Sequence, residues 1–271
     1  MTAGHGPPPL RLATFLAPNM QPVYRFLADH LAARLDRPVE LVVGTSFAQF
    51  QRGQADVGVI CGLPYVWLAA QRPPPVEPLA APVLSGERYG GRPICFSDVI
   101  VRRDRPVTRL EDLRGCSWAY NDPTSHSGYT LTLHALVRMG ARPGFFGRLV
   151  QAGYHERSVE LVARGEVDAS AIDSQVLAVA LRDQPELAAS LRVVGTFGPS
   201  TIQPVVAASR LPEQVKIAVR DALLDLDGRR AAEPGLAHGF VERFVAIDDG
   251  DYDDIRAMLA AIRAAGFTTL W

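Results

Sequence analysis

The segments that most limit the fold of this chain are short apolar stretches that alternate with stretches of helical periodicity. Strands are predicted at Leu10–Leu16, Val39–Val43 and Val57–Ile60, with helices over Gln21–Leu35 and Phe47–Arg52 between them. An order of strand, helix and strand is typical of βα units, whose strands pair mainly in parallel. The first part of the chain therefore predicts an α/β fold.

A similar pattern resumes after the proline-rich linker Pro73–Pro75. The segments "DVIVRR", "LEDLRG" and "SWAYND" predict a strand, a short helix and a strand, and "NDPTSHSGYTLTLHALVRMG" follows as a loop and a helix. Next come a strand near Leu149, a helix over His155–Arg164, a strand at Val167–Ile172 and a helix from about Gln175. At 271 residues the chain is long enough for two domains of ordinary size.

Composition narrows the range of functions. The chain is 48% hydrophobic and 21% charged, as in globular proteins, and a net charge of −1 without basic clusters argues against binding nucleic acid or an anionic membrane. Cys61, Cys95 and Cys116 have neither metal-knuckle spacing nor an even count, which argues against a disulfide framework, although one pair could form. No apolar run reaches membrane-spanning length, and the N-terminal segment lacks the pattern of a secretory signal.

The loop "NDPTSHSGY" places several hydroxyl groups in front of the helix that follows it. Asp122, Thr124, Ser125 and Ser127 all belong to residue types that cap helix N-termini, yet one cap needs only one of them. A helix N-terminus also offers free N–H donors and the positive end of the helix dipole, which suit an oxyanion. The pattern therefore allows either a plain cap or an anion site.

Two segments of the chain echo each other. "QFQRGQADVGVICG" (residues 49–62) and "LVARGEVDASAIDS" (residues 161–174) share Arg-Gly, a two-residue gap and Asp before a strand. Glycine suits the residue after a helix, so an ordinary helix-to-strand connection could produce this match. The match could instead indicate two similar lobes. Each strand would then end at a cleft, with Cys61 to Tyr65 on one side and Asp173 and Ser174 on the other.

Together these segments resemble the phosphonate-type periplasmic substrate-binding proteins of ABC transporters. The resemblance rests on "FQRGQADVGVICGLPYV", "FSDVIVRRD", "LEDLRGCSWAYNDPTSHSGYTL" and "GYHERSVELVARGEVDASAIDS", and it covers residues 10 to 209 approximately. It implies the α/β type II periplasmic-binding-protein fold, in which two crossover hinge strands join two lobes and the ligand cleft lies between the lobes. On this basis we expect lobe one at residues 8–97 and 204–271 and lobe two at residues 98–203, with crossovers at "SDVIVRR" and "TIQPVVAAS".

The resemblance also implies ligand-binding residues. The family loop usually reads Asp-Pro-small-Ser-Thr-Ser-Gly-aromatic, so Ser125 and Ser127 match its serines and His126 replaces its threonine. His155 matches a family histidine, and Asp173 lies near an acidic residue that can meet a ligand amine. The expected binding residues are Tyr65, Phe96, Ser125, His126, Ser127, His155 and Asp173.

Some of these residues allow plainer roles. Phe96 stands where the family often has tyrosine and so lacks a hydroxyl, which Tyr89 could supply from nearby. Asp173 could cap the next helix, and Tyr65 could lie in the core. His126 would titrate between about pH 5 and pH 8 if it faces the cleft, so that affinity rises as pH falls, or it could be an exposed loop residue.

The function that the resemblance implies is capture of a small oxyanion, such as phosphonate, phosphite or phosphate, by lobe closure for an ABC transporter. We expect a monomer that is not an enzyme, with the oxyanion and an ABC transporter permease as partners and no nucleic acid. The family is periplasmic, whereas the missing signal pattern also allows a cytoplasmic protein, which could be a leaderless ligand sensor of the same fold.

Two other classes of function can be built from the same residues. Ser127, His155 and Asp173 are the residue types of a hydrolase triad, but their chain order and the absence of G-x-S-x-G argue against the α/β-hydrolase arrangement. His126, His155 and Asp173 could ligate a metal, but their spacing carries no metal-site signature. We therefore expect no metal and no cofactor.

Overall fold

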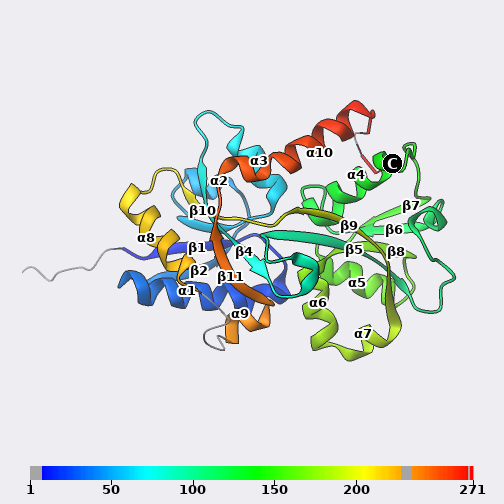
Figure 1. Cartoon of the computed structure of the whole chain (residues 1–271), viewed down its shortest axis with the longest axis horizontal. Coiled ribbons are helices and arrows are strands. Elements are labelled where there is room, and N and C mark those ends of the chain that lie inside the picture. Colours follow the sequence, from blue (N-terminus) through cyan, green and yellow to red (C-terminus); the bar gives the residue numbers. More distant parts are fainter. Residues whose placement is uncertain (1–7, 227–233, 268, 271) are drawn as a thin grey trace, which may run out of the picture. The chain divides into compact units, whose positions relative to one another are not determined.

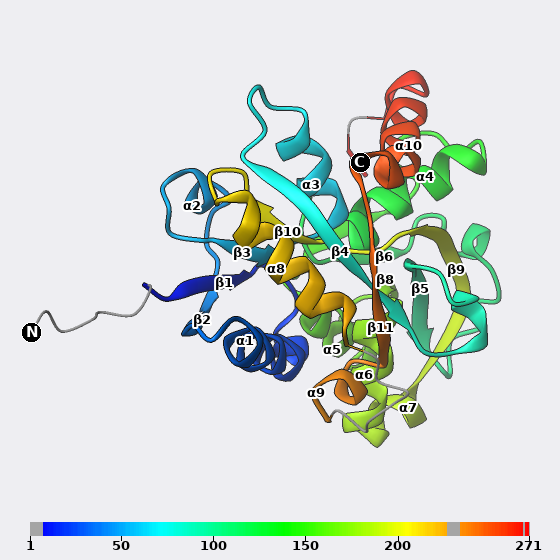
Figure 2. The same cartoon turned by 60° about the vertical axis from the view of Figure 1, so that its left-hand side comes forward.

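The computed structural model describes residues 8–226, 234–267 and 269–270, and the chain divides into two compact units that each contain one β-sheet (Figures 1 and 2). Unit 1 consists of Met1–Leu16, Met20–Pro93 and Ile202–Tyr252, and unit 2 consists of Ala17–Asn19, Ile94–Thr201 and Asp253–Trp271. Apart from the short segment Ala17–Asn19, the main chain passes from one unit to the other after Pro93, after Thr201 and after Tyr252. The second passage lies in the predicted crossover "TIQPVVAAS".

Unit 1 contains a six-stranded sheet in the order β11-β4-β10-β3-β1-β2. Its strands are β1 (Leu10–Thr14), β2 (Val39–Val43), β3 (Val57–Val59), β4 (Val76–Leu84), β10 (Val205–Ala208) and β11 (Val241–Ala246). β1 pairs in parallel with β2 and β3, as the alternation of strands and helices predicted. The pairs that involve β10 and β11 are antiparallel.

The helices of unit 1 follow the apolar periodicity of the sequence. They are α1 (Gln21–Leu35), α2 (Ala48–Gln51), α3 (Gly62–Ala69), α8 (Glu213–Leu224) and α9 (Pro234–His238), with 3₁₀ turns at Glu87–Tyr89 and Asp249–Tyr252. A further 3₁₀ turn, Pro18–Met20, begins in the Ala17–Asn19 segment of unit 2. Val23, Leu27 and Leu31 recur every fourth residue on the buried side of α1, which packs against α8, α9 and β2. α1 ends at Asp36, whose backbone is left-handed with φ 45°.

Unit 2 contains a five-stranded sheet in the order β7-β6-β8-β5-β9. Its strands are β5 (Ile94–Arg102), β6 (Ser117–Tyr120), β7 (Arg148–Gln151), β8 (Ala169–Asp173) and β9 (Leu191–Thr201). β6 pairs in parallel with β7 and β8, whereas β5 pairs antiparallel with β8 and β9. The segments that enter and leave this unit, β5 and β9, are thus hydrogen-bonded to each other.

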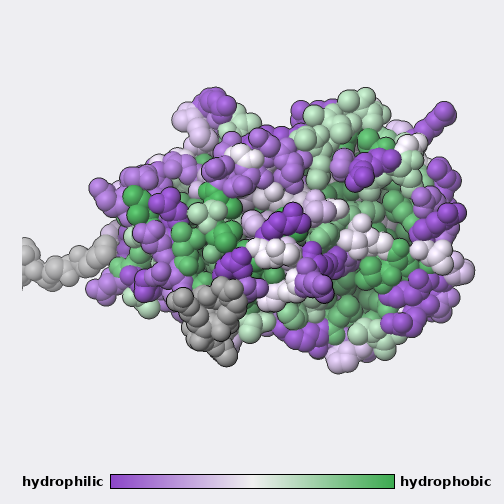
Figure 3. All heavy atoms as spheres, in the orientation of Figure 1, coloured by the Kyte–Doolittle hydropathy of each residue, from purple (hydrophilic) through white to green (hydrophobic). Residues whose placement is uncertain are grey.

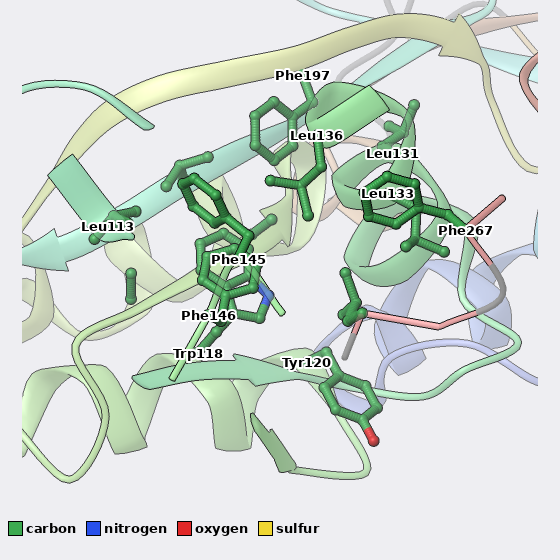
Figure 4. Packing of buried hydrophobic residues seen from close by; sticks show 14 of the residues in the cluster. Leu113, Trp118, Tyr120, Leu131, Leu133, Leu136, Phe145, Phe146, Phe197 and Phe267 are labelled. Carbon is green, nitrogen blue, oxygen red and sulfur yellow. The ribbon is translucent and has the colours of Figure 1, made fainter. Parts of the chain in front are cut away.

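The helices of unit 2 cover an aromatic core. They are the π-helix η4 (His126–Thr130), α4 (Leu131–Arg138), α5 (His155–Ala163), α6 (Ser174–Asp183), α7 (Pro185–Ser190) and α10 (Asp253–Ala264), with a 3₁₀ turn at Leu110–Leu113. Trp118 of β6 is fully buried, and its ring stacks on Phe146 with 4.4 Å between centroids (Figure 4). Phe145 meets Phe146 edge to face at 5.0 Å. This cluster holds α4, and thus the helix after the hydroxyl-rich loop, against the sheet.

The echo between the two halves of the sequence has a structural counterpart. Gly53 follows α2 with φ 68° and Gly165 follows α5 with φ 71°, and both occupy the left-handed region that glycine tolerates. In both units the strand after this glycine lies between a parallel neighbour and an antiparallel one: β3 between β1 and β10, and β8 between β6 and β5. The match in sequence therefore marks two units of similar topology.

The aspartate of each echo segment fixes the strand that begins beside it. Asp56 Oδ2 accepts a hydrogen bond from Arg11 N at 2.9 Å, and Asp168 Oδ2 accepts one from Ser117 N at 2.8 Å. The backbone N–H of each aspartate in turn donates to the carbonyl of the same residue, at 2.9 Å and 3.2 Å respectively. Each aspartate thus fixes the point at which the pairing of two parallel strands begins.

The predicted division into lobes is wrong for the C-terminal segment. We expected residues 204–271 in lobe one, but Asp253–Trp271 belong to unit 2. α10 packs against α4, and Ile262, Phe267 and Leu270 join the core of unit 2. An amphipathic helix shows which of its faces is buried but not which sheet covers that face, so the sequence pattern could not assign α10.

Hydrophobic residues reach the surface among hydrophilic ones on the face drawn in Figure 3. The exposed large apolar side chains include Trp67 at 42% and Tyr154 at 55% exposure, on α3 and before α5. Within the residues that the structure describes, no helix has both the length and the apolar character that crossing a membrane would require.

Replacing Ile262 with alanine tests the placement of α10. Ile262 is 5% exposed in the core of unit 2, so Ile262→Ala should lower the free energy of unfolding by about 2 to 5 kcal/mol. The matched control is Ile217→Ala, because Ile217 is 39% exposed on α8 and its loss should cost within about 0.5 kcal/mol. Urea unfolding followed by circular dichroism measures both, and equal costs would contradict the packing of α10.

Candidate functional site

The candidate residues of unit 2 follow the ends of adjacent parallel strands. β6 ends at Tyr120 and leads into the loop with Ser125, β7 ends at Gln151 before His155, and β8 ends at Asp173. β6 pairs in parallel with β7 on one side and with β8 on the other, so these strands end at the same edge of the sheet. That edge is where open α/β sheets bind ligands.

Ser125 is the residue that caps the helix. Its Oγ accepts a hydrogen bond from Gly128 N at 3.0 Å, and its carbonyl accepts one from Thr130 N at 3.1 Å. The second bond spans five residues and makes the first turn a π-helix, a form that is frequent at functional sites. Because one residue supplies the cap, the hydroxyl of Ser127 is available for another purpose.

Ser127 lies between a histidine and a carboxylate. Its Oγ is 3.1 Å from Nε2 of His155, and its hydroxyl also lies near enough to the Asp173 carboxyl to lower the pKa of that group. Asp173 in addition caps α6, where its Oδ1 accepts from Gln175 N at 2.9 Å and from Val176 N at 3.3 Å. The capping role that the sequence allowed for Asp173 is therefore real, and it coexists with the contact to Ser127.

Burial determines the charge of this cluster. Burial lowers the pKa of His155 from 6.5 to about 4, so the imidazole is neutral near pH 7. Burial also raises the pKa of Asp173 from 3.8 to about 6; the nearby Asp98 carboxylate adds to the increase, and hydrogen bonds to the carboxylate oppose it. An oxyanion here would be held by neutral O–H and N–H donors at the start of η4 rather than by a charged histidine.

Gly128 allows the loop and the strand ends to approach closely. A Cβ atom at this position would lie 2.0 Å from Asn121 Oδ1 and 3.0 Å from His155 Cε1. The first distance is too short for any Cβ atom and the second is tight, so a side chain here would force Asn121 and His155 to shift.

The His126 side chain makes its hydrogen bond with Ser200 and not with Ser127 or His155. Its Nε2 lies 2.7 Å from Oγ of Ser200, at the end of β9, and Ser200 Oγ donates to Asp254 Oδ2 at 2.7 Å. The side chain is 2% exposed, and burial lowers its pKa from 6.5 to about 4, although the Asp254 carboxylate acts in the opposite direction.

Burial excludes one of the roles considered for His126, because a residue that is 2% exposed is not an exposed loop histidine. Burial also lowers its pKa to about 4, below the range of about pH 5 to pH 8 that was expected if the residue faces the cleft. Whether His126 contacts the ligand stays a prediction.

Tyr65 and Phe96 occupy different units. Tyr65 lies on α3 of unit 1, where its hydroxyl donates to Asp249 Oδ1 at 2.7 Å and its ring packs 4.5 Å from that of Tyr252. Phe96 lies in β5 of unit 2, and its backbone N–H donates to Oγ of Ser174, the residue after Asp173. Tyr89, the suggested substitute for a family tyrosine, is buried in unit 1. Ligand contacts of Tyr65 and Phe96 stay predictions.

The hydrogen-bond order in the cluster differs from that of a hydrolase triad. In a triad histidine lies between the serine and the carboxylate, whereas here Ser127 lies between His155 and Asp173. Nδ1 of His155, which a triad aspartate would contact, has no hydrogen-bond partner among the described residues. Within the part of the chain that the structure describes, no group of three His, Cys, Asp or Glu residues is placed to hold a metal ion, and Cys61, Cys95 and Cys116 form no disulfide bond.

Comparison with known proteins decides the family. The model of the periplasmic substrate-binding proteins of phosphonate ABC transporters matches residues 12–252. The chain belongs to this family. The role of a family member is to bind a substrate for transport, and the family is periplasmic. The recognition made from the loop and the echo segments is confirmed.

Solved structures confirm the fold of this family member. The binding protein component of an ABC phosphonate transporter from Pseudomonas aeruginosa is similar with a TM-score of 0.83 and 19% identity, over 96% of this chain and 88% of that chain. PhnD1 from Prochlorococcus marinus, solved in complex with methylphosphonate, has a TM-score of 0.82 and 18% identity, over 95% of this chain and 99% of that chain. The aliphatic sulphonate binding protein SsuA from Escherichia coli has a TM-score of 0.63 and 15% identity, over 98% and 91%. The predicted two-lobed type II periplasmic-binding-protein fold is thereby confirmed.

Two contacts of the site were missed by reasoning from the sequence. Ser200 and Asp254 bind neither Ser127 nor His155. Ser200 is 74 residues from His126 along the chain, and Asp254 is a further 54 residues from Ser200. No local pattern points to such a contact. Ser174 was named only as a member of the echo segment, and its hydroxyl accepts from Phe96 N.

Histidine titration by NMR tests the electrostatics of the site. The imidazole signals of His126 and His155 should stay constant from about pH 8 to about pH 5, because both pKa values are about 4, and both should titrate near 6.5 in urea. Between the unfolded pKa of 6.5 and the folded pKa of about 4, the histidines bind protons in the unfolded chain but not in the folded chain. These two histidines therefore lower the stability of the fold as pH falls from 6.5 to about 4. Asp173 raises the stability of the fold as pH falls, because its folded pKa of about 6 exceeds the ordinary value of 3.8, so the folded chain binds the proton first. A midpoint near 6.5 for either folded histidine would contradict the burial described.

Proposed function

We propose that this protein binds phosphonate or a related phosphorus oxyanion at the start of η4 and presents it to an ABC transporter permease. The observation that carries the proposal is the Ser127–His155 pair, with 3.1 Å between Oγ and Nε2, at a helix N-terminus capped by Ser125. Membership of the phosphonate family supports the class of ligand. The complex of PhnD1 with methylphosphonate shows that a protein of this fold binds such a molecule.

The chemistry of the cluster suits a tetrahedral anion. The first N–H groups of a helix lack intrahelical acceptors and carry the positive end of its dipole. Ser127 can turn its O–H toward a ligand oxygen, and neutral His155 can donate through one ring nitrogen. Hydrogen bonds to a charged acceptor are stronger than those between neutral groups, so several neutral donors suffice without a cation.

Asp173 would interact with an amine on the organic part of the ligand. Its carboxylate is buried beside Asp98, and a ligand amine would offset the repulsion between these two groups. A phosphonate that carries an amine should therefore bind more tightly than methylphosphonate. We further propose that the protein acts in the periplasm, in keeping with its family, and that it is a monomer.

Calorimetry with a panel of oxyanions tests the ligand class. Methylphosphonate, an aminoalkylphosphonate, phosphite and phosphate should bind, whereas sulfate and carboxylates should bind weakly. Ser127→Ala should weaken phosphonate binding by about tenfold or more, because a hydrogen bond to a charged group contributes about 1.5 to 3 kcal/mol. Ser190→Ala removes a serine on α7 that donates to Leu187 O, and it should leave affinity unchanged.

Three outcomes of this panel are decisive. Absence of heat with every phosphorus oxyanion would remove the proposed ligand class. An equal effect of Ser127→Ala and Ser190→Ala would remove the assigned site. Steady hydrolysis of an ester that Ser127→Ala abolishes would show that the protein is an enzyme. For the amine, Asp173→Asn keeps a capping residue type and should abolish the advantage of the aminoalkylphosphonate.

Lobe closure on binding stays a prediction from the family resemblance. If ligand favours a closed state, the radius of gyration should decrease when methylphosphonate saturates the protein, since a ligand shifts an equilibrium only through its different affinity for the two states. Small-angle scattering with and without methylphosphonate measures this, and Ser127→Ala at the same ligand concentration serves as the control. Identical wild-type curves at saturation would contradict closure.

A further inference from the structure

A second chain of hydrogen bonds begins at the residue next to Ser127. His126 Nε2 lies 2.7 Å from Ser200 Oγ, Ser200 Oγ donates to Asp254 Oδ2 at 2.7 Å, and Thr201 N donates to the same oxygen at 2.9 Å. All these residues belong to unit 2. His126 and Ser200 are 2% exposed, whereas Asp254 is half-buried, so the histidine and the serine lie out of water.

Ser200, Thr201 and Asp254 lie next to the points where the chain passes from one unit to the other. Ser200 and Thr201 end β9, and the next residue, Ile202, belongs to unit 1. The chain re-enters unit 2 at Asp253, the first residue of α10, and Asp254 is the second residue of that helix. The first residue of η4 is thus joined to two of the segments through which the chain passes from one unit to the other.

The donors and acceptors can be assigned from chemistry. An ionised carboxylate only accepts, so Ser200 donates its O–H to Asp254. Ser200 Oγ is then free to accept from His126, which must carry a proton on Nε2. The charged or titratable groups that face His126 are Asp254 on α10 and His134 on α4, which favour opposite charge states of its ring. Burial outweighs Asp254, and the imidazole is neutral.

A buried polar chain of this kind adds little to net stability, because removing polar groups from water costs about as much as their bonds return. Its contribution is geometric, since each group has one direction in which it is satisfied. A fixed His126 fixes the first turn of η4, whose next residue is Ser127 and whose cap is Ser125.

We propose that His126, Ser200 and Asp254 form a positioning chain that sets the orientation of the Ser125–Ser127 loop and thereby the affinity for the oxyanion, although Ser200 and Asp254 do not touch the ligand. The proposal rests on the proposed function. It assigns to the histidine that replaces the family threonine a role in holding the site rather than in protonating the ligand.

Binding of methylphosphonate to four variants tests the chain. Ser200→Ala, Asp254→Asn and His126→Leu should each weaken binding by about tenfold, the change that loss of one ordinary hydrogen bond produces. His126→Gln keeps an N–H near the position of Nε2 and should restore most of the affinity. The matched control is Ser170→Ala, because Ser170 is a fully buried serine of unit 2 whose hydroxyl donates to Ala119 O at 2.9 Å and lies outside the chain.

Melting temperatures separate positioning from general destabilisation. Ser170→Ala should lose stability but keep wild-type affinity, whereas Ser200→Ala should lose affinity out of proportion to its change in melting temperature. Wild-type affinity in both Ser200→Ala and Asp254→Asn would overturn the proposal. If His126→Gln binds as weakly as His126→Leu while Ser200→Ala binds normally, His126 contacts the ligand itself and the proposal is equally wrong.

A measurement without ligand keeps this inference apart from the proposed function. The ¹⁵N shifts of the His126 ring should report a neutral imidazole protonated at Nε2, and Ser200→Ala should change them. A proton on Nδ1 in the wild type would overturn the chain. If wild-type protein binds no phosphorus oxyanion, the proposed function fails, whereas the ¹⁵N shifts still decide whether the hydrogen-bond chain exists.

Discussion

The arrangement of both sheets depends on one repeated contact, in which an aspartate holds the backbone of a neighbouring strand. Asp56 exchanges hydrogen bonds with the backbone of Arg11, and Asp168 does so with Ser117. Burial by itself would raise the pKa of Asp56, but bonds from Arg11 and Arg210 lower it, so the carboxylate stays charged. This contact fixes the register of adjacent parallel strands, and the register determines which residues meet at their carboxyl ends.

In unit 2 that register brings Ser127 together with Asp173, and β7 adds His155 from the other side of β6. Desolvation then sets the chemistry, because it removes charge from His155 and raises the pKa of Asp173. The result is a site of neutral donors at a helix start. Such a site fits the phosphonate-binding family to which the chain belongs.

The same order of groups occurs twice around η4, with a serine hydroxyl between a histidine and an aspartate. Ser127 lies between His155 and Asp173, and Ser200 lies between His126 and Asp254. We propose that the first group binds the ligand and that the second supports it. Both histidines are buried and neutral, so the difference between the groups lies in the elements that they connect rather than in their charge.

The sequence by itself determined the features that arise from local patterns. Alternating apolar segments predicted the parallel β1, β2 and β3, the Arg-Gly-x-x-Asp echo predicted two similar units, and the residue types before α4 predicted the cap that Ser125 provides. Only the tertiary structure decided the rest. It placed α10 on unit 2, because periodicity specifies a buried face and not its partner. It also gave His126 its contacts with Ser200 and, through it, Asp254, because residues so distant along the chain meet only once the sheet and α10 are in place.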